Sequence, residues 1–342
     1  MDLHIVWFVL WGVLWGVYFM LDGFVLGAGM LHRVLGKTDG DRRVIINSFG
    51  PVWDGNEVWL LTAGGATFAA FPTTYALMFS YLYTPLLLLL FALIVRGVSF
   101  EFRGKEEGAA WRGCWDWAIV ICSFVPALLF GVAFGNIFAG LPMDQAGYHG
   151  SLVYLLNPYG IVSGLLFVLL FLEHGALYVA VKSTGSLSRS AEDLARLLWI
   201  PLLVIAVVFL GYTNFATKLY HNYVAAPVFA VVPLSAVAAL LSVRLFLAKG
   251  RAPAAFAASC VTILGVVFTG VIGLFPNLIP SSLDPNFHLS IYNSSSSEYT
   301  LGIMTTVAFI FVPIVILYKI WAYRLFRERL TVESVAADHE AY

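Results

Sequence analysis

The chain has 342 residues, of which 60% are hydrophobic and only 11% are charged, with a formal net charge of −1 and a mean hydropathy of +0.86. About a quarter of the residues of an ordinary soluble domain are charged, so this composition excludes a soluble protein with a water-facing surface. The net charge, without any basic stripe, excludes a nucleic-acid binder. The continuous apolar runs exclude an outer-membrane barrel, whose strands alternate. The composition therefore predicts an all-α polytopic membrane protein.

Nine apolar runs divide the chain, and each is long enough to cross a bilayer, since a transmembrane helix needs about 20 apolar residues. The runs lie at 5–30, 47–71, 74–96, 113–137, 157–181, 196–216, 225–245, 253–276 and 299–321. The second run begins with acids and an amide, so its first half could instead be re-entrant. We expect residues 1–330 to form a single transmembrane domain of nine helices, arranged as two four-helix bundles and one peripheral helix. We expect residues 331–342 to form a short, poorly ordered cytoplasmic tail.

Lysine and arginine placement predicts the direction of the spans. These residues gather in five segments, and Lys218 alone among the 19 lies elsewhere. The five segments are 31–46, 96–112, 182–196, 244–251 and 319–329. Nine spans put all five on one side of the membrane, and the positive-inside rule makes that side cytoplasmic. The N-terminus is then outside and the C-terminus cytoplasmic.

A faint internal repeat is visible in the positions of polar residues. Asp22-Gly23 in the first run and His174-Gly175 in the fifth are separated by four spans. Residues 1–137 and 157–276 would then be parallel copies, with 299–321 as an extra helix. Glycine-rich apolar segments also resemble each other by default, so a chain without duplication stays an open alternative.

Acidic residues inside the membrane spans indicate a structural or functional role, because a charge near the centre of a transmembrane helix costs about 2.5–3.5 kcal/mol. The candidates are Asp22, Asp54, Glu57, Asp116, and Glu173 with its neighbour His174. On the predicted topology all of them lie in the cytoplasmic half of the membrane. A two-sided transport pathway would scatter ionisable groups through the full depth. The one-sided set therefore favours an inlet that takes protons from the cytoplasm.

Asp54 and Glu57 are the pair to which we assign proton transfer. They are three residues apart, share a helix face, lie beside Asn56 and are flanked by Trp53 and Trp59. Two acids on one buried face can share a proton.

Structural roles are the alternatives for the other polar residues. Asp22 could pair with an arginine of a cytoplasmic loop, and Asp116, between two tryptophans, could anchor its helix at the membrane interface. His174 is expected to hydrogen-bond a neighbour rather than a metal, and Glu173 has no assigned role. A membrane b-type haem usually takes two axial side chains at matching depth, and no such pair is present in the sequence. We therefore expect no haem iron or other metal to be ligated by this chain.

At this point the residues resemble subunit II of the cytochrome bd-type quinol oxidases, over nearly the whole length. The most specific segment runs from Pro51 to Leu60 and reads PVWDGNEVWL. Further matches are Leu21-Asp22-Gly23-Phe24, Trp115-Asp116-Trp117, Gly131-Val132-Ala133-Phe134-Gly135-Asn136 and Leu156-Asn157-Pro158.

The resemblance implies a subunit of a respiratory terminal oxidase of the bacterial cytoplasmic membrane, which oxidises quinol and reduces oxygen to water. In that family two b-type haems, one d-type haem and the quinol-oxidation site belong to subunit I. Subunit II forms an obligate heterodimer with it, in contact with lipid and quinone, and small accessory subunits can join. The resemblance implies no nucleic-acid partner.

The resemblance also assigns residues. Asp54 matches the family's acid on the proton route, and Trp59, with Trp53 nearby, matches a tryptophan at the proposed oxygen access or interface. The expected proton pathway is Asp54, Glu57, Asp22 and Asn56. Members often carry an acid where Val25 stands and Gln where Glu57 stands, so the arrangement of acids departs from the family. The alternatives are a proton-coupled secondary transporter with its site at Asp54 and Glu57, and a purely structural scaffold.

Overall fold

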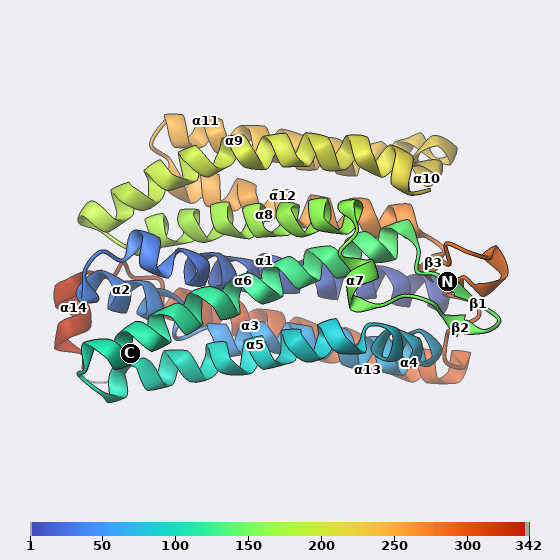
Figure 1. Ribbon diagram of the computed structural model, residues 1–342, viewed down its shortest axis with the longest axis horizontal. Coiled ribbons are helices and arrows are strands. Elements are labelled where there is room, and N and C mark those ends of the chain that lie inside the picture. Colours follow the sequence, from blue (N-terminus) through green and yellow to red (C-terminus); the bar gives the residue numbers. More distant parts are fainter. Residues whose placement is uncertain (1, 339–341) are drawn as a thin grey trace.

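The structure is a computed structural model that describes residues 2–338 and 342. Most of these residues form long helices that run roughly along the longest axis of the molecule (Figure 1). The α-helices are α1 (Leu3–Leu35), α2 (Asp39–Phe49), α3 (Trp53–Ala70), α4 (Pro72–Tyr81), α5 (Tyr83–Phe102), α6 (Ala109–Ala139), α7 (Leu152–Leu155), α8 (Pro158–Lys182), α9 (Gly185–Ala216), α10 (Tyr220–Ala225), α11 (Val231–Ala248), α12 (Ala252–Leu274), α13 (Glu298–Leu325) and α14 (Val332–Ala337). The short elements are the 3₁₀ helices η1 (Arg103–Lys105), η2 (Pro227–Ala230) and η3 (Pro285–Phe287), and the strands β1 (Met143–Asp144), β2 (Gly147–Tyr148), β3 (Asn277–Ile279) and β4 (Leu289–Ser290).

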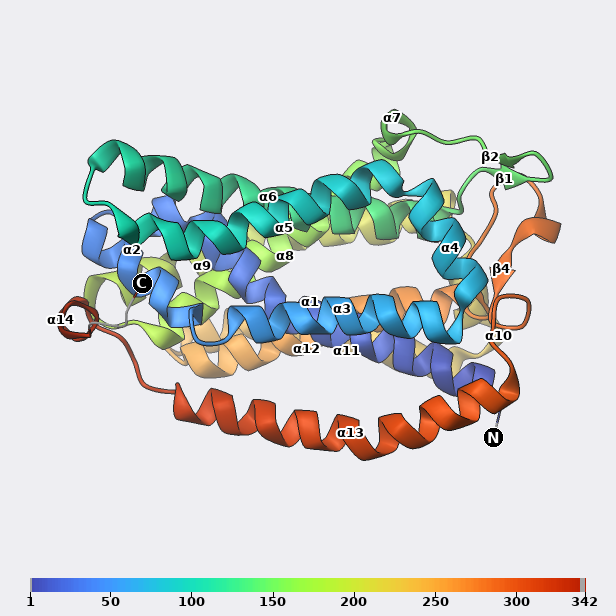
Figure 2. The same cartoon turned by 90° about the horizontal axis from the view of Figure 1, so that it is seen from below.

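Eight of the described helical segments are long and apolar enough to cross a membrane. They are α1, α5 with η1, α6, α8, α9, η2 with α11, α12 and α13. They confirm an all-α polytopic membrane protein and correspond to eight of the nine predicted runs. The second run corresponds to α3, which lies beside α1 (Figure 2) but has only 18 residues and carries two acids.

Local sequence signals explain where several helices begin and end. Thr38 and Asp41 form a capping box at the start of α2, in which each side chain bonds the other residue's backbone N–H. Pro72 stands at the first position of α4, where its fixed φ suits a helix start and its missing N–H costs nothing. Asn157 caps α8 by accepting a bond of 2.9 Å from the Gly160 N–H.

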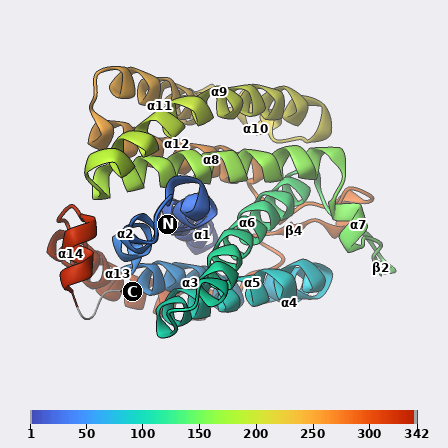
Figure 3. The same ribbon diagram turned by 60° about the vertical axis from the view of Figure 1, so that its left-hand side comes forward.

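The helix α1 lies at the centre and packs against α3, α6, α8 and α12. Both Figure 1 and Figure 3 place α8 between α1 and the layer that α9 and α11 form. Glycines allow the central approach: a Cβ added to Gly27 of α1 would overlap the Phe171 carbonyl of α8, and one on Gly175 of α8 would overlap the backbone of Ala28. Gly131 of α6 meets α8 at Ser163 in the same way. These small residues therefore serve packing within the chain.

The two ends of the bundle differ. The end that carries α2, η1 and α14, together with the α8–α9 and α11–α12 connections, holds most Lys and Arg residues, and we call it the basic end (Figure 1). The opposite end carries the N-terminus, α7, α10 and two small antiparallel hairpins, in which Met143 pairs with Tyr148 and Asn277 with Ser290. The five basic segments of the sequence thus meet at one end.

The C-terminal segment is more ordered than expected. Of α13, all of which is described, Leu301 alone is buried, and this helix lies along the outside of the bundle (Figure 2). Beyond it the chain crosses the basic end, where the Lys182 ammonium donates to the carbonyls of Phe326 and Glu328. The helix α14 then packs against α2, with Val335 buried. The expectation of a poorly ordered tail is wrong for residues 331–338; residues 339–341 lie outside the described residues.

Candidate functional site

Four side chains from three helices meet inside the bundle, and we call them the acid cluster: Tyr18 and Asp22 of α1, Glu57 of α3 and Arg96 of α5. Nη2 of Arg96 lies 3.0 Å from Oδ2 of Asp22 and 2.5 Å from Oε1 of Glu57. The Tyr18 hydroxyl donates to Oδ2 of Asp22 at 3.2 Å. Tyr18, Asp22 and Arg96 are fully buried, whereas the Glu57 side chain is 23% exposed. The cluster therefore reaches from the surface of α3 into the core.

Arg96 is the residue that sequence reasoning misplaced. We expected it in the loop at 96–112, but α5 continues to Phe102 and encloses it. The signal was present, because Val98 and Phe100 extend the apolar pattern beyond Arg96. Asp22 does pair with an arginine, but this arginine lies within α5 and not in a loop as expected. The pairing explains how an acid is tolerated at this depth.

The Arg96 guanidinium is only partly satisfied. Its Nε and Nη1 are buried and have no hydrogen-bond partner among residues 2–338 and 342. A guanidinium has five N–H donors and no acceptor, and buried donors in native proteins nearly always find a protein or water acceptor. The acid cluster therefore suits bound water beside its two carboxyl groups.

Asp54 has different surroundings from Glu57, although both belong to the start of α3. Asp54 is exposed, and its Oδ1 accepts a bond of 2.5 Å from the Gly55 N–H. The Lys319 ammonium of α13 lies against Gly55. The expectation that both acids share a buried face is right for Glu57 and wrong for Asp54, which lies on the outer side of the helix.

The amide of Asn56 and the two tryptophans hold α3 in place. Asn56 is buried, donates to the Leu21 carbonyl of α1 at 2.9 Å and accepts from the Tyr323 hydroxyl of α13 at 2.9 Å. Trp53 lies against α5, with its ring edge-on to Phe100 at 5.3 Å. Trp59 is buried in the main apolar core.

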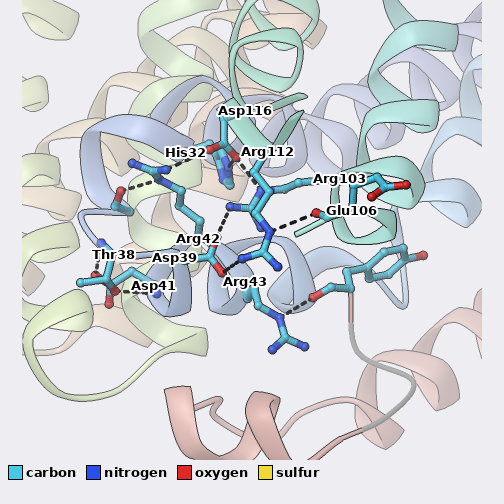
Figure 4. A network of polar contacts seen from close by, with 12 residues as sticks. His32, Thr38, Asp39, Asp41, Arg42, Arg43, Arg103, Glu106, Arg112 and Asp116 are labelled. Carbon is cyan, nitrogen blue, oxygen red and sulfur yellow. Dashed lines mark hydrogen bonds and ion pairs between the residues drawn. The ribbon is translucent and has the colours of Figure 1, made fainter. Parts of the chain in front are cut away.

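A second polar cluster occupies the basic end (Figure 4). We call it the basic-end network, and its members are His32, Asp39, Arg42, Arg103, Arg112 and Asp116. Asp116 of α6 is its centre and is fully buried. Its Oδ1 lies 2.6 Å from both Nε2 of His32 and Nε of Arg103, and its Oδ2 lies 2.9 Å from Nη1 of Arg42. Farther out, Asp39 of α2 lies 2.6 Å from Arg103. We expected Asp116 to anchor α6 at the membrane interface; it anchors α6 instead through buried pairs with α1, α2 and η1.

Glu173 and His174 lie side by side on α8 and are both buried. Nδ1 of His174 lies 2.7 Å from the Ser259 hydroxyl, Nε2 lies 3.0 Å from the Met20 carbonyl, and the ring stacks on Phe256 with centroids 4.7 Å apart. Both nitrogens are therefore engaged, and His174 does not fit as a haem ligand. Oε1 of Glu173 has no partner within the described residues.

No metal site is formed by the part of the chain that the structure describes, since no group of three or more His, Cys, Asp or Glu side chains comes together there. Three of the predicted acids, Asp22, Glu57 and Asp116, are paired with cations. Asp54 is exposed, about one helical turn from Glu57 on α3.

Comparisons with known proteins agree with this arrangement. Residues 3–326 match the family described as cytochrome bd terminal oxidase subunit II. The chain belongs to this family. It is 36% identical to cytochrome bd-I ubiquinol oxidase subunit 2 of Escherichia coli, an alignment that covers 99% of this chain and 98% of the relative. It is also 36% identical to cytochrome bd ubiquinol oxidase subunit 2 of Bacillus subtilis, with 96% and 97% covered.

A solved structure supports the fold. The bd oxidase structure from Geobacillus thermodenitrificans contains a chain that matches with a TM-score of 0.79 at 19% identity, over 95% of this chain and 99% of that one. Family membership and the 36% identical relatives show that the chain is a membrane subunit of a terminal oxidase, an oxidoreductase complex that oxidises quinol and reduces oxygen. It is a multi-pass protein of the bacterial inner membrane. Family membership leaves the secondary-transporter alternative without support.

Proposed function

We propose that this subunit supplies the oxidase with a proton inlet from the cytoplasm and gives structural support to the haem-bearing subunit I. One observation carries the proposal: the acid cluster links partly exposed Glu57 through Arg96 to buried Asp22 and Tyr18. Exposed Asp54 lies about one helical turn from Glu57 on α3, at the outer side of this cluster. Ionisable groups inside a membrane protein are expensive and mark ion or proton pathways by default.

The groups of this route have different tasks. Arginine stays protonated in proteins, so Arg96 holds the geometry and does not pass protons. Glu57 and Asp22 each bond the same Arg96 nitrogen, and the free N–H groups of Arg96 can orient water between them. Protons would then move over carboxyl groups and water. Asn56 hydrogen-bonds both α1 and α13 and acts as a positioning residue beside this route.

The surface around Asp54 is where we place subunit I. Asp54 shares the outer side of α3 with Val58, Leu61 and Phe68, which are 53%, 74% and 60% exposed. A carboxylate that faced lipid beside these side chains would be costly, and a partner subunit removes that cost. In the resulting heterodimer the two b-type haems and the d-type haem belong to subunit I, since His174 is engaged elsewhere. Trp53 and Trp59, which belong to the same helix α3, are our candidates for oxygen access or the interface, Trp59 from its buried position in the apolar core.

The number and direction of the membrane spans belong to the proposal as well. We propose nine spans, with α3, within the run at 47–71, as the crossing that joins the eight long apolar helices, and residues 1–330 as one transmembrane domain in two four-helix groups with α13 outside them. The basic end then faces the cytoplasm by the positive-inside rule, the N-terminus lies outside, and residues 331–342 are cytoplasmic. The concentration of basic residues at one end supports this orientation (Figure 1).

Oxygen uptake per haem tests the proton route in the purified oxidase with quinol as the reductant. Asp54→Asn cannot ionise and should lower the rate at least about tenfold, because positioned proton transfer contributes a factor of about 10² to 10⁴. Asp54→Glu should keep more activity than the amide. Asp193→Asn is the matched control, since Asp193 is a 72% exposed acid near the basic end of α9, and it should turn over normally. A wild-type rate for Asp54→Asn with intact haems would make Asp54 a structural residue.

A further inference from the structure

A polar pocket of about 540 Å³ opens at the end of the bundle opposite to the basic end. It lies between the outer ends of α6, α9 and α12, the start of α10 and the β3–β4 segment. Its polar lining includes Lys218, His221, Asn222, Ser281, Ser282 and His288. No Asp or Glu lines it in the described part of the chain. The pocket thus gathers hydrogen-bond donors without a carboxylate among them.

Lys218 gives the pocket its charge. It is the single Lys or Arg of the sequence outside the five basic segments. It has no ion-pair partner among the described residues, since every ion pair found there joins other side chains. A free ammonium on the wall of a pocket without acids favours an anion.

His288 adds a fixed donor. Its Nδ1 accepts a bond of 2.9 Å from the Ser281 backbone N–H, so the ring proton is on Nε2. Burial and the nearby charge of Lys218 lower the pKa of His288, which keeps this neutral tautomer. Ser281 is itself held by the Met143 carbonyl at 2.5 Å, so the wall that carries His288 is tied to the neighbouring hairpin. The nearest acid, Asp284, is occupied as the cap of η3.

An apolar cavity of about 70 Å³ lies next to this pocket, inside the bundle between α8, α9, α11 and α12. Phe138 and Leu219 line both spaces. They approach α12 closely because it has Gly270 and Gly273 at the contact points. The rim is apolar and open, since Phe215 of the pocket wall is 85% exposed. A polar head and an apolar tail are therefore accommodated side by side.

We propose that this pocket binds the phosphate headgroup of an anionic phospholipid from the leaflet at that end of the bundle. Lys218 and Nε2–H of His288 hold the phosphodiester, and an acyl chain follows Phe215 and Leu219 toward the apolar cavity. The charge of Lys218 selects a net negative headgroup, and the apolar rim selects a lipid over free phosphate. The site lies at the far end from the acid cluster, so the proposal is independent of the proton route.

Native mass spectrometry of the delipidated, intact oxidase complex tests this, with phosphatidylglycerol, phosphatidylcholine and inorganic phosphate as the probes. We expect one tight phosphatidylglycerol site. Lys218→Gln should weaken it at least about tenfold, because the phosphate loses its charged hydrogen-bond donor. Lys218→Arg should retain it. Lys249→Gln is the matched control, because Lys249 is an exposed lysine of the basic end, and it should leave the affinity unchanged.

Four outcomes would overturn the proposal. Equal binding of phosphatidylcholine and phosphatidylglycerol would remove the role of net charge. Displacement of the lipid by millimolar inorganic phosphate would make the pocket a free-anion site. Equal losses in Lys218→Gln and Lys249→Gln would indicate nonspecific attraction. Displacement of the lipid by an equimolar quinone would show that the pocket binds the uncharged headgroup of a quinone.

Discussion

The acid cluster and the basic-end network are built from the same kinds of side chain but are completed differently. In the network, buried Asp116 receives three donors within 3.0 Å, from His32, Arg42 and Arg103. In the acid cluster, buried Arg96 has two carboxylate partners, yet two of its nitrogens have no partner among the described residues. In the network the open position, Nδ1 of His32, is on the far side of a ring whose other nitrogen bonds Asp116, whereas in the acid cluster the central charged group itself, Arg96, has unpaired nitrogens among the described residues.

This difference indicates that a buried ion-pair cluster can serve either to stabilise the fold or to transfer protons. A buried charge whose partners are all protein groups is fixed in one arrangement and loses much when one partner is removed. A cluster with spare donors accepts water and can change its protonation without breaking the fold. In the network two arginines and His32 surround the single carboxylate of Asp116, whereas Asp22 and Glu57 share one arginine. We therefore expect variants of the network to affect assembly and variants of the cluster to affect turnover.

The largest change in the free energy of unfolding is expected for Asp116→Asn. The amide keeps the size of the side chain but leaves His32, Arg42 and Arg103 without their common carboxylate. Removing one partner of a buried ion pair costs about 3–5 kcal/mol. The yield of assembled oxidase and its thermal unfolding midpoint should fall, while oxygen uptake per haem of the surviving complex stays near normal.

Asp39→Asn is the matched variant within the same network. The Asp39 side chain is 42% exposed and pairs with Arg103 and Arg112, and exposed pairs contribute about 0–1 kcal/mol. Its unfolding midpoint should therefore stay close to that of the wild type. If Asp39→Asn lowered the midpoint as much as Asp116→Asn, burial would not be what distinguishes the network's centre.

A smaller loss of stability and a larger loss of turnover are expected for Asp22→Asn. Arg96 keeps Glu57 as a charged partner, so the cost approaches the value of one charged hydrogen bond, about 1.5–3 kcal/mol. The amide at position 22 cannot carry a proton, and oxygen uptake per haem should fall at least about tenfold. Parallel measurement of midpoint and uptake for Asp22→Asn and Asp116→Asn checks the contrast. Normal uptake in Asp22→Asn would make the acid cluster a second structural network.

The sequence was sufficient for most of the fold. Eight spans follow from apolar runs, and their ends follow from caps such as Asn157 and breakers such as Pro72. The runs were less informative for α3, because Asp54 and Glu57 lower its hydropathy and only the balance of basic loops indicates a crossing. Lys182 holds the chain just after α13 through the carbonyls of Phe326 and Glu328, and Arg43 of α2 donates to the Val335 carbonyl of α14. No local pattern in the sequence of the tail predicts these contacts.

The candidate site was predictable in its acids and not in their partners. The free-energy cost of a charge inside a membrane span singles out Asp22, Glu57 and Asp116 from the sequence alone. They do not reveal that Arg96 lies within α5, that His32 faces Asp116, or that Tyr323 reaches Asn56 across 267 positions of the chain. Pairing between distant helices depends on their rotation about their own axes, and a hydropathy pattern without a clear polar face leaves that rotation undetermined.

The smallest effect is expected from loss of the hydrogen bond between Tyr323 and Asn56. Asn56 is next to Glu57 in the sequence, but its side chain bonds neighbouring helices, as the residues of the basic-end network do. Its amide joins α1 to α3, and its carbonyl accepts from the Tyr323 hydroxyl of α13. Tyr323→Phe removes that single neutral hydrogen bond, which is worth about 0.5–1.5 kcal/mol. The unfolding midpoint should fall slightly, and oxygen uptake per haem should stay within about twofold of the wild type, since no ionisable group of the cluster is lost. Tyr318→Phe is the control, because Tyr318 is 59% exposed on the same helix, and it should change neither quantity. A tenfold loss of uptake in Tyr323→Phe alone would instead make the Asn56–Tyr323 bond part of the proton route.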